Sequence, residues 1–264
     1  MPTELPPEQV RPPAADPRSW LFWAGLPIIA AQGLWVRQRA RRSEEAPGPR
    51  QGLIGAAGSG PPLRLVAVGD SIIAGVGLAS TSDALPAQLA QALASRLSRP
   101  VHWRAEGCNG ARANQTLSQL QRQPELVSGC DLLLVSAGVN DVTGLRRRSA
   151  FSTDLLQLLS LLQQHAPGAR AVLAAAPPLE AFPLLPSPLR QLLGLRARQL
   201  DQLIAESARQ VDFALHAQIP FPPEPKAFAA DGFHPNAPSC VLWANQIADQ
   251  LLKRWPRLAA EQVA

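Results

Sequence analysis

The sequence predicts a three-layer α/β sandwich, in which helices cover both faces of a parallel sheet of about five strands. Short, continuous apolar runs recur along residues 63–255, and such runs are typical of strands that are buried on both faces. Segments with apolar residues at helical spacing separate these runs, and strands that alternate with helices favour a parallel sheet. Hydrophobic residues make up 46% of the 264-residue chain, which is enough for one core.

The individual elements follow from the same patterns. The expected strands are apolar runs bounded by glycine, proline or polar residues, over residues 63–68, 101–105, 131–136, 171–175 and 211–214. The expected helices carry leucine or alanine every three or four residues, over residues 83–98, 113–122, 151–165, 188–210 and 238–253. Asp83 is expected to cap the first of these helices. Because ligands of parallel sheets bind beyond the carboxyl ends of the strands, residues that follow each strand are the candidates for a site.

The chain outside this domain differs in composition. Residues 1–19 are proline-rich without periodicity, which predicts a disordered leader. Residues 20–36 are uncharged and mostly apolar, and they reach the short limit of a membrane crossing, which takes roughly 17–25 residues. Residues 37–62 are basic and then rich in glycine and proline, which predicts a linker. The sandwich occupies residues 63–255, and residues 256–264 form a tail.

Residues 20–36 allow more than one interpretation. We expect a single-pass anchor that makes the protein membrane-associated. The arginines on its carboxyl side favour a cytoplasmic location for the main domain. Because the run is short and contains Pro27, the alternative is a helix that lies at the membrane interface or packs against the protein.

Charge and cysteine content exclude several classes of protein. The net charge of +5 comes from 25 basic and 20 acidic residues spread along the chain, so no nucleic-acid partner is expected. Cys108, Cys130 and Cys240 show no Cys-x-x-Cys spacing. Such a set argues against a disulfide framework and against a structural zinc site.

Ser71 is the candidate nucleophile. The stretch Gly69-Asp70-Ser71 follows the first expected strand and places Ser71 at the start of a helical segment. A serine there can attack a substrate and offer its own backbone N–H to the developing oxyanion. The alternatives are a helix cap and a phosphate-binding loop, although the stretch lacks the Gly-Lys-Ser/Thr ending of such loops.

Gly110 and Asn140 are candidate oxyanion donors, because they follow the second and third expected strands. Gly110 would supply a backbone N–H and Asn140 its side-chain amide. The alternatives are an ordinary loop glycine and ordinary Asn-Asp turn chemistry.

His234 is the candidate general base, and Asp231, three residues earlier, is its candidate partner. His102, His165 and His216 lack a carboxylate three residues earlier in the sequence. The Gly-x-Ser-x-Gly elbow of the α/β-hydrolases is absent around Ser71, so the triad has a different arrangement.

Together these residues resemble the SGNH, or GDSL, family of esterases and lipases. Its blocks match Gly69-Asp70-Ser71, then Gly110 with Gly107 as a second choice, then the Gly-x-Asn-Asp stretch at Asn140, and finally Asp231 to His234. The resemblance covers residues 63–255, with Ile72 in place of the usual leucine. It implies a flavodoxin-like fold and a triad of Ser71, Asp231 and His234. It also implies an oxyanion hole of Ser71, Gly110 and Asn140, with no metal and no organic cofactor.

The resemblance implies a serine esterase that acts through an acyl-serine on a small-molecule or lipid ester. Lipid, lysophospholipid-like and short-chain esters stay open as substrates. A carbohydrate O-acetyl esterase or an acyltransferase could use the same triad. A non-catalytic, flavodoxin-like binding module is the alternative of another class. Residues 177–195 are apolar and proline-rich, and they are expected to form either an acyl-binding wall or lid, or ordinary packing.

Overall fold

The described part of the chain begins after the expected leader. The computed structural model describes residues 26–39, 43–55, 61–219, 225–256 and 258. The leader over residues 1–19 and the first part of the expected anchor, residues 20–25, lie outside the described residues. Most of the expected tail, residue 257 and residues 259–264, lies outside them as well.

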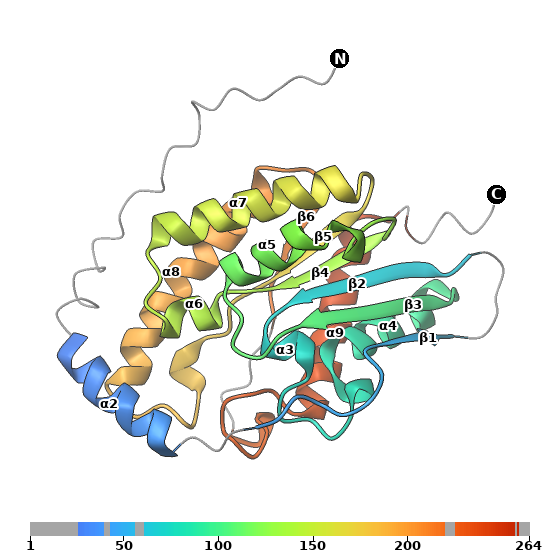
Figure 1. Cartoon of the computed structure of the whole chain (residues 1–264). Coiled ribbons are helices and arrows are strands. Elements are labelled where there is room, and N and C mark those ends of the chain that lie inside the picture. Colours follow the sequence, from blue (N-terminus) through green and yellow to red (C-terminus); the bar gives the residue numbers. More distant parts are fainter. Residues whose placement is uncertain (1–25, 40–42, 56–60, 220–224, 257, 259–264) are drawn as a thin grey trace.

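A six-stranded sheet with the order β1-β3-β2-β4-β5-β6 forms the centre of the molecule (Figure 1). Its strands are β1 (Gln51–Ile54), β2 (Leu63–Gly69), β3 (Val101–Gly107), β4 (Leu132–Ser136), β5 (Arg170–Ala174) and β6 (Ala214–Ala217). Neighbouring strands are parallel except β1 and β3, which are antiparallel. The five parallel strands have the flavodoxin-like order of a doubly wound sheet. The predicted α/β sandwich is therefore confirmed, with one strand more than about five.

Helices cover both faces of this sheet (Figure 1). The α-helices are α2 (Leu26–Arg39), α3 (Ser71–Ala74), α4 (Leu85–Leu97), α5 (Ala113–Arg122), α6 (Val139–Thr143), α7 (Arg148–His165), α8 (Leu189–Arg209) and α9 (Ala237–Arg254). Short 3-10 turns are η1 (Thr81–Asp83), η2 (Pro124–Leu126), η3 (Leu179–Ala181) and η4 (Pro225–Ala227). α4 and α9 pack on one face, and α5, α7 and α8 pack on the other.

The strands divide their side chains between two cores. In β2, Val66 and Val68 join the apolar cluster formed with α5, α7 and α8, whereas Leu65 and Ala67 join the cluster formed with α4 and α9. Successive side chains of a strand point to opposite faces. Because both faces of the sheet are covered, the sequence of each central strand is largely a continuous apolar run.

The carboxyl ends of three neighbouring strands are level. Gly69, the last residue of β2, pairs with Gly107 at the end of β3 and with Ser136 at the end of β4. The loops that follow these strands therefore start at one edge of the sheet.

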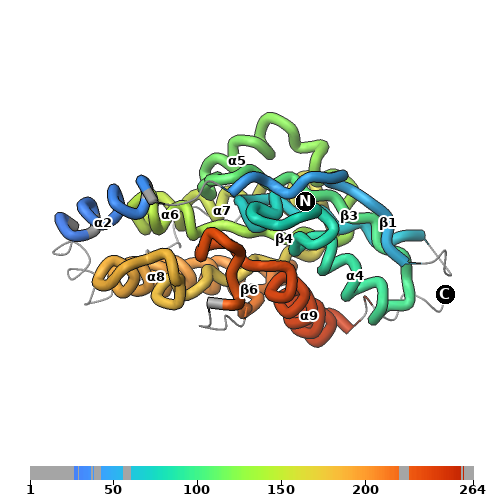
Figure 2. The backbone as a smooth tube through the Cα atoms, turned by 90° about the horizontal axis from the view of Figure 1, so that it is seen from below, coloured from blue at the N-terminus to red at the C-terminus, as the bar shows by residue number. Residues whose placement is uncertain are grey.

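The segment before the sandwich differs from its sequence prediction. Residues 51–54, within the expected linker, form β1 beside β3. α2 lies beside α8 at one end of the molecule (Figure 2). The side chain of Gln32 donates to the carbonyl oxygen of Ser187 and accepts from the N–H of Leu189, both at 2.9 Å.

The expected membrane crossing over residues 20–36 is not supported. The described part of that segment belongs to α2, of which 14 residues are described. In the described ranges, no helix combines the length and the apolar character that a crossing requires. The cytoplasmic orientation depended on that crossing and loses its support with it.

Two local predictions are wrong. A strand was expected over residues 211–214, but β6 starts at Ala214. Val211 and Phe213 are apolar because they pack against the core, and the pairing with β5 begins at Ala214. Asp83 does not cap α4. It lies inside η1, and Ala84 precedes the helix without a side-chain cap.

Candidate active site

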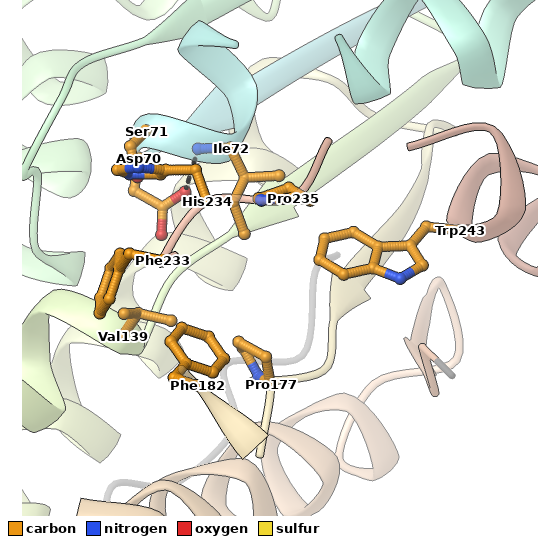
Figure 3. Close-up of a pocket in the computed structure, with 10 residues that line it drawn as sticks. All are labelled: Asp70, Ser71, Ile72, Val139, Pro177, Phe182, Phe233, His234, Pro235 and Trp243. Carbon is orange, nitrogen blue, oxygen red and sulfur yellow. Dashed lines mark hydrogen bonds between the residues drawn. The ribbon is translucent and has the colours of Figure 1, made fainter. Parts of the chain in front are cut away.

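A small pocket at the carboxyl edge of the sheet brings together groups that are far apart in the sequence (Figure 3). It contains about 280 Å³ of empty space. Its lining residues come from the segments after β2, β4 and β5, from the segment leading into α9 and from α9 itself, and they are Asp70, Ser71, Ile72, Val139, Pro177, Phe182, Phe233, His234, Pro235 and Trp243. The expected nucleophile and the expected base thus share one pocket.

Ser71 owes its position to the two residues before it. Gly69 has a φ of +142°, and a Cβ there would lie 2.1 Å from the carbonyl oxygen of Ser136, so this turn requires glycine. Asp70 then caps α3, because its Oδ1 accepts from the N–H of Ile72 at 3.1 Å (Figure 3, dashed line). Asp70, and not Ser71, is therefore the helix cap, and Ser71 is the first residue of the helix.

Asp70 is a buried carboxyl group at the edge of the pocket. Burial raises its pKa, although a hydrogen bond from Ser136 and the cap bond from Ile72 act in the opposite direction. The Ser136 hydroxyl donates to Oδ1 at 2.9 Å, and Oδ2 has no hydrogen-bond partner among the described residues. The environment therefore favours the neutral form of this carboxyl more than water would.

His234 is held by Asp231 in one tight loop. The ring Nδ1 lies 2.7 Å from Asp231 Oδ2. The other carboxylate oxygen, Oδ1, accepts from the backbone N–H groups of Phe233 and His234, each at 2.9 Å. This arrangement leaves Nε2 of His234 as the ring nitrogen without a carboxylate partner, which is what a general base requires.

The electrostatics of Asp231 suit a partner that stays ionised. Burial alone would raise its pKa, but hydrogen bonds from the His234 ring, from Ser43 and from two backbone N–H groups lower it below the ordinary value. Ser43 is a contributor that sequence reasoning missed. Its hydroxyl donates to Asp231 Oδ2 at 2.6 Å, from 188 residues away in the chain. No local pattern indicates such a contact.

Ser71 and His234 line the same pocket, but no hydrogen bond joins their side chains among the described residues. In active sites without substrate this bond is often long and tightens only in the complex. Ser71 is only 7% exposed, so its surroundings are largely fixed before a substrate enters.

Of the three expected oxyanion residues, Ser71 lines the pocket, whereas Gly110 and Asn140 are not among its lining residues. Asn140 belongs to α6, directly after β4, and its Nδ2 donates to the carbonyl oxygen of Ala111 at 2.9 Å. An amide group carries two hydrogens, so this bond leaves one for another acceptor. Gly110 has a φ of +79°, and no heavy atom lies within 4 Å of the position that a Cβ would take. The Asn140 amide therefore joins the loop after β3 to the loop after β4.

Gly107, the second choice for the oxyanion glycine, has a different explanation. A Cβ there would lie 2.4 Å from the backbone nitrogen of Ala74, so glycine lets β3 end against α3. This packing requirement accounts for Gly107 without a catalytic role.

A second histidine–carboxylate pair was missed from the sequence. His216 Nε2 lies 2.9 Å from Asp201 Oδ1, although no acidic residue stands near His216 in the Asp-x-x-His manner. The same oxygen accepts from the N–H of Ala176 at 2.9 Å. The pair connects α8 to β6 and does not line the pocket of Ser71.

The fold is a doubly wound α/β sandwich with Ser71 and His234 in one pocket, and comparison with known proteins gives the family. The model of the GDSL-like lipase/acylhydrolase family matches residues 67–238. The chain belongs to this family, as its motifs predicted. No curated protein matches the chain.

Solved structures with the same fold have low sequence identity to this chain. A carbohydrate esterase family 2 enzyme with a carbohydrate-binding domain, from Corynascus thermopiles (Myceliophthora fergusii), has a TM-score of 0.60 and 17% identity, covering 77% of this chain and 69% of its own. The lipase Lip_vut3 from a goat rumen metagenome has a TM-score of 0.59 and 15% identity, covering 73% and 97%. A lipase/acylhydrolase from Enterococcus faecalis has a TM-score of 0.56 and 19% identity, covering 73% and 96%. Family membership and these neighbours support a hydrolase.

Proposed function

We propose that the protein is a serine esterase that hydrolyses carboxylic esters through an acyl-serine intermediate. The observation that carries this proposal is the shared pocket of Ser71 and His234, with Asp231 held on the far ring nitrogen at 2.7 Å. Nucleophile, base and base-orienting carboxylate are the three groups that such catalysis requires.

The proposed reaction has two halves. His234 Nε2 removes the proton of Ser71 while the hydroxyl oxygen attacks the ester carbonyl carbon. The oxyanion accepts hydrogen bonds from the N–H groups of Ser71 and Gly110 and from the amide of Asn140. The C–O bond to the alcohol then breaks, and His234 returns the proton to the departing alkoxide. In the second half a water molecule loses its proton to His234 and attacks the acyl carbon, which releases the carboxylic acid and restores Ser71.

Asp231 has a defined part in this scheme. It remains an anion while His234 gains and loses a proton, and it stabilises the imidazolium. The lowered pKa of Asp231, produced by four hydrogen bonds that outweigh burial, supports this role.

The wall of the pocket supports an ester with a short acyl group. The ring of Phe182 packs edge-on against Phe228 and Phe233, with centroids 5.2 and 5.0 Å apart. The resulting pocket is small and lined mostly by apolar side chains, which suits a short acyl group better than a long chain. Phe182 and Pro177 belong to the apolar segment 177–195, which supports the wall interpretation of that segment.

Carbohydrate O-acetyl esters are a second candidate, favoured by a polar hollow next to Gly110. Asn109, Gln115 and Gln119 line this hollow together with Gly110 itself. Amide side chains of this kind can bind the hydroxyl groups of a sugar alcohol. An acetyl group on a sugar would combine a small acyl part with a polar leaving group. Acyl transfer to an alcohol would use the same residues as hydrolysis.

The test is turnover of p-nitrophenyl esters from acetyl to palmitoyl, alongside acetylated sugars, by the protein and by Ser71→Ala. We expect turnover to be fastest for the shortest acyl groups and to disappear in the variant. Labelling by a fluorophosphonate should also require Ser71, whereas a non-catalytic binding module would not be labelled. A Ser71→Ala protein with full esterase activity would overturn the proposal. Release of a new ester when an alcohol is added would identify acyl transfer.

A further inference from the structure

We propose that the N-terminal strap, defined as residues 43–50, positions both halves of the active site: Ser43 orients Asp231, and Glu45 holds the loop that carries Gly110. This inference rests on the proposed function. The strap lies before the part of the chain that matches the family model, residues 67–238. Ser43 and Glu45 would act as positioning residues, because they contact groups of the site and not the reacting atoms.

Backbone hydrogen bonds fix the strap on the main domain. The N–H groups of Gly77 and Thr81 donate to the carbonyl oxygens of Glu44 and Pro47, both at 3.0 Å. The side chain of Ala46 is buried between these bonds. The strap passes beside α3, where the N–H of Ala46 donates to the carbonyl oxygen of Ala74 at 3.4 Å, and it continues into β1 (Figure 1). Its path is therefore set independently of the two side chains that reach the site.

Ser43 shares one oxygen with the candidate base. Its hydroxyl lies 2.6 Å from Asp231 Oδ2, the atom that also contacts His234 Nδ1 at 2.7 Å. With both backbone N–H groups on Oδ1, the carboxylate has a donor fixing each oxygen and cannot rotate without losing one. The hydroxyl also helps to lower the pKa of Asp231 against the effect of burial. Ser43 therefore controls both the direction and the basicity of the group that orients His234.

Glu45 acts on the other half of the site. Its Oε1 accepts from the N–H of Asn109 at 2.9 Å, directly before Gly110. Its Oε2 pairs with Arg50, and Arg50 Nη1 donates to the carbonyl oxygen of Gly107 at 2.8 Å. The Glu45–Arg50 pair thus holds the loop after β3 on both sides of Cys108. The N–H of Gly110 can serve an oxyanion only if this loop stays in place.

The first experiment tests Ser43 by kinetics over pH 4–9 with p-nitrophenyl acetate. Ser43→Ala should lower kcat about tenfold, the effect of losing a hydrogen bond to a charged group, with little change in KM. The carboxylate would then attract protonated His234 more strongly, so the acid limb of kcat/KM should move to higher pH. Asp70 also faces this pair and is present in every variant, so it does not alter the comparison. Ser43→Thr keeps the hydroxyl and should restore both values.

The matched control is Ser82→Ala, which removes an exposed hydroxyl that donates to Ser80 Oγ at 2.8 Å, away from the pocket. It should leave kcat and the pH profile unchanged. Glu45→Ala should lower kcat several-fold without moving the acid limb, whereas Glu45→Gln keeps the acceptor for Asn109 and should retain most activity.

The outcomes separate the strap from the proposed function. If Ser43→Ala and Glu45→Ala keep the kcat and pH profile of the parent while Ser71→Ala is inactive, the strap does not position the site and the esterase proposal stands. If Ser71→Ala stays active, the proposed function is wrong, and the strap inference, which rests on it, is overturned with it. If Ser43→Ala does not fold, circular dichroism will reveal it. The decision then falls on Ser43→Thr and the two Glu45 variants, and equal losses in both Glu45 variants overturn the inference.

Discussion

The described part of the chain holds two histidine–carboxylate pairs with similar distances, and of the two histidines only His234 lines the pocket of Ser71. His234 lies 2.7 Å from Asp231, and His216 lies 2.9 Å from Asp201. The first pair uses ring nitrogen Nδ1 and leaves Nε2 available, whereas the second uses Nε2. The difference teaches that a histidine close to a carboxylate is not sufficient to identify a catalytic base. The engaged nitrogen and the surroundings of the other one distinguish a candidate base from a structural pair.

The two carboxylates differ as well. Asp231 accepts from two backbone N–H groups, the His234 ring and the Ser43 hydroxyl. Asp201 accepts at Oδ1 from the His216 ring and the N–H of Ala176, and so joins α8 to the end of β5. The second arrangement suits packing, since it connects a helix to the sheet that it covers.

Replacing the two histidines should separate the pairs most strongly. His234→Gln should lower kcat by about 10⁵-fold or more, because loss of the base in a serine triad removes nearly all of its effect. His216→Gln should keep kcat within about twofold and lower only the melting temperature. Both are measured with p-nitrophenyl acetate at pH 7.5. Similar losses in the two variants would show that the comparison between the pairs is mistaken.

Replacing the two carboxylates should give a somewhat smaller difference in kcat than replacing the two histidines. Asp231→Asn should lower kcat by about 10⁴-fold, since an amide cannot stabilise the imidazolium and favours the wrong tautomer. Asp201→Asn should leave turnover intact. Melting temperatures of both variants serve as the control for folding, and an active Asp231→Asn protein would remove Asp231 from the proposed triad.

Asn140 sharpens the comparison, because it is the proposed oxyanion donor for the site of Ser71 and His234, whereas no such role is proposed near His216. Asn140→Ala should lower kcat by about 10²–10³-fold, the usual cost of one oxyanion donor. Thr143→Ala, on the same short helix, removes a hydroxyl that donates to the carbonyl oxygen of Val139 at 3.2 Å and should have little effect. Equal rates for the two variants would exclude Asn140 from the oxyanion hole.

The smallest expected effect is on stability as a function of pH. The pKa of Asp231 is lower in the folded protein than its ordinary value. The ionised carboxylate therefore stabilises the fold above about pH 4, and this stabilisation is lost as the pH falls toward the folded value. Denaturant unfolding of the parent and of Asp231→Asn should differ by an amount on the order of 1 kcal/mol at pH 7, and the difference should shrink at pH 3. A difference that does not change with pH would contradict the lowered pKa.

Much of the fold follows from local patterns. β2 and β4 were predictable because strands buried on both faces must be apolar throughout. That Ser71 and His234 share one pocket was predictable, because each belongs to a short motif of the family. The start of β6 was not predictable, because Val211 and Phe213 are apolar through core packing, and apolar character alone does not indicate strand pairing.

The rest depends on contacts that no local pattern records. Ser43 meets Asp231 across 188 residues, and Asp201 meets His216 across a helix and a turn. The segment around Ser43 has the composition of a linker, since it is rich in small residues and proline. Its backbone is ordered by bonds to Gly77 and Thr81, which lie far ahead in the chain.

β1 also bears on how the molecule behaves toward other copies of itself. It covers the outer edge of β3 from Val101 to Arg104, and Gly52 leaves room for the indole of Trp103. Without β1, the seven-residue strand β3 would present a row of bare N–H and C=O groups to solvent. With it, both borders of the sheet are strands of only four residues, which offer a poor template for intermolecular pairing. By covering the edge of β3, residues 51–54 therefore disfavour edge-to-edge aggregation in addition to completing the sheet.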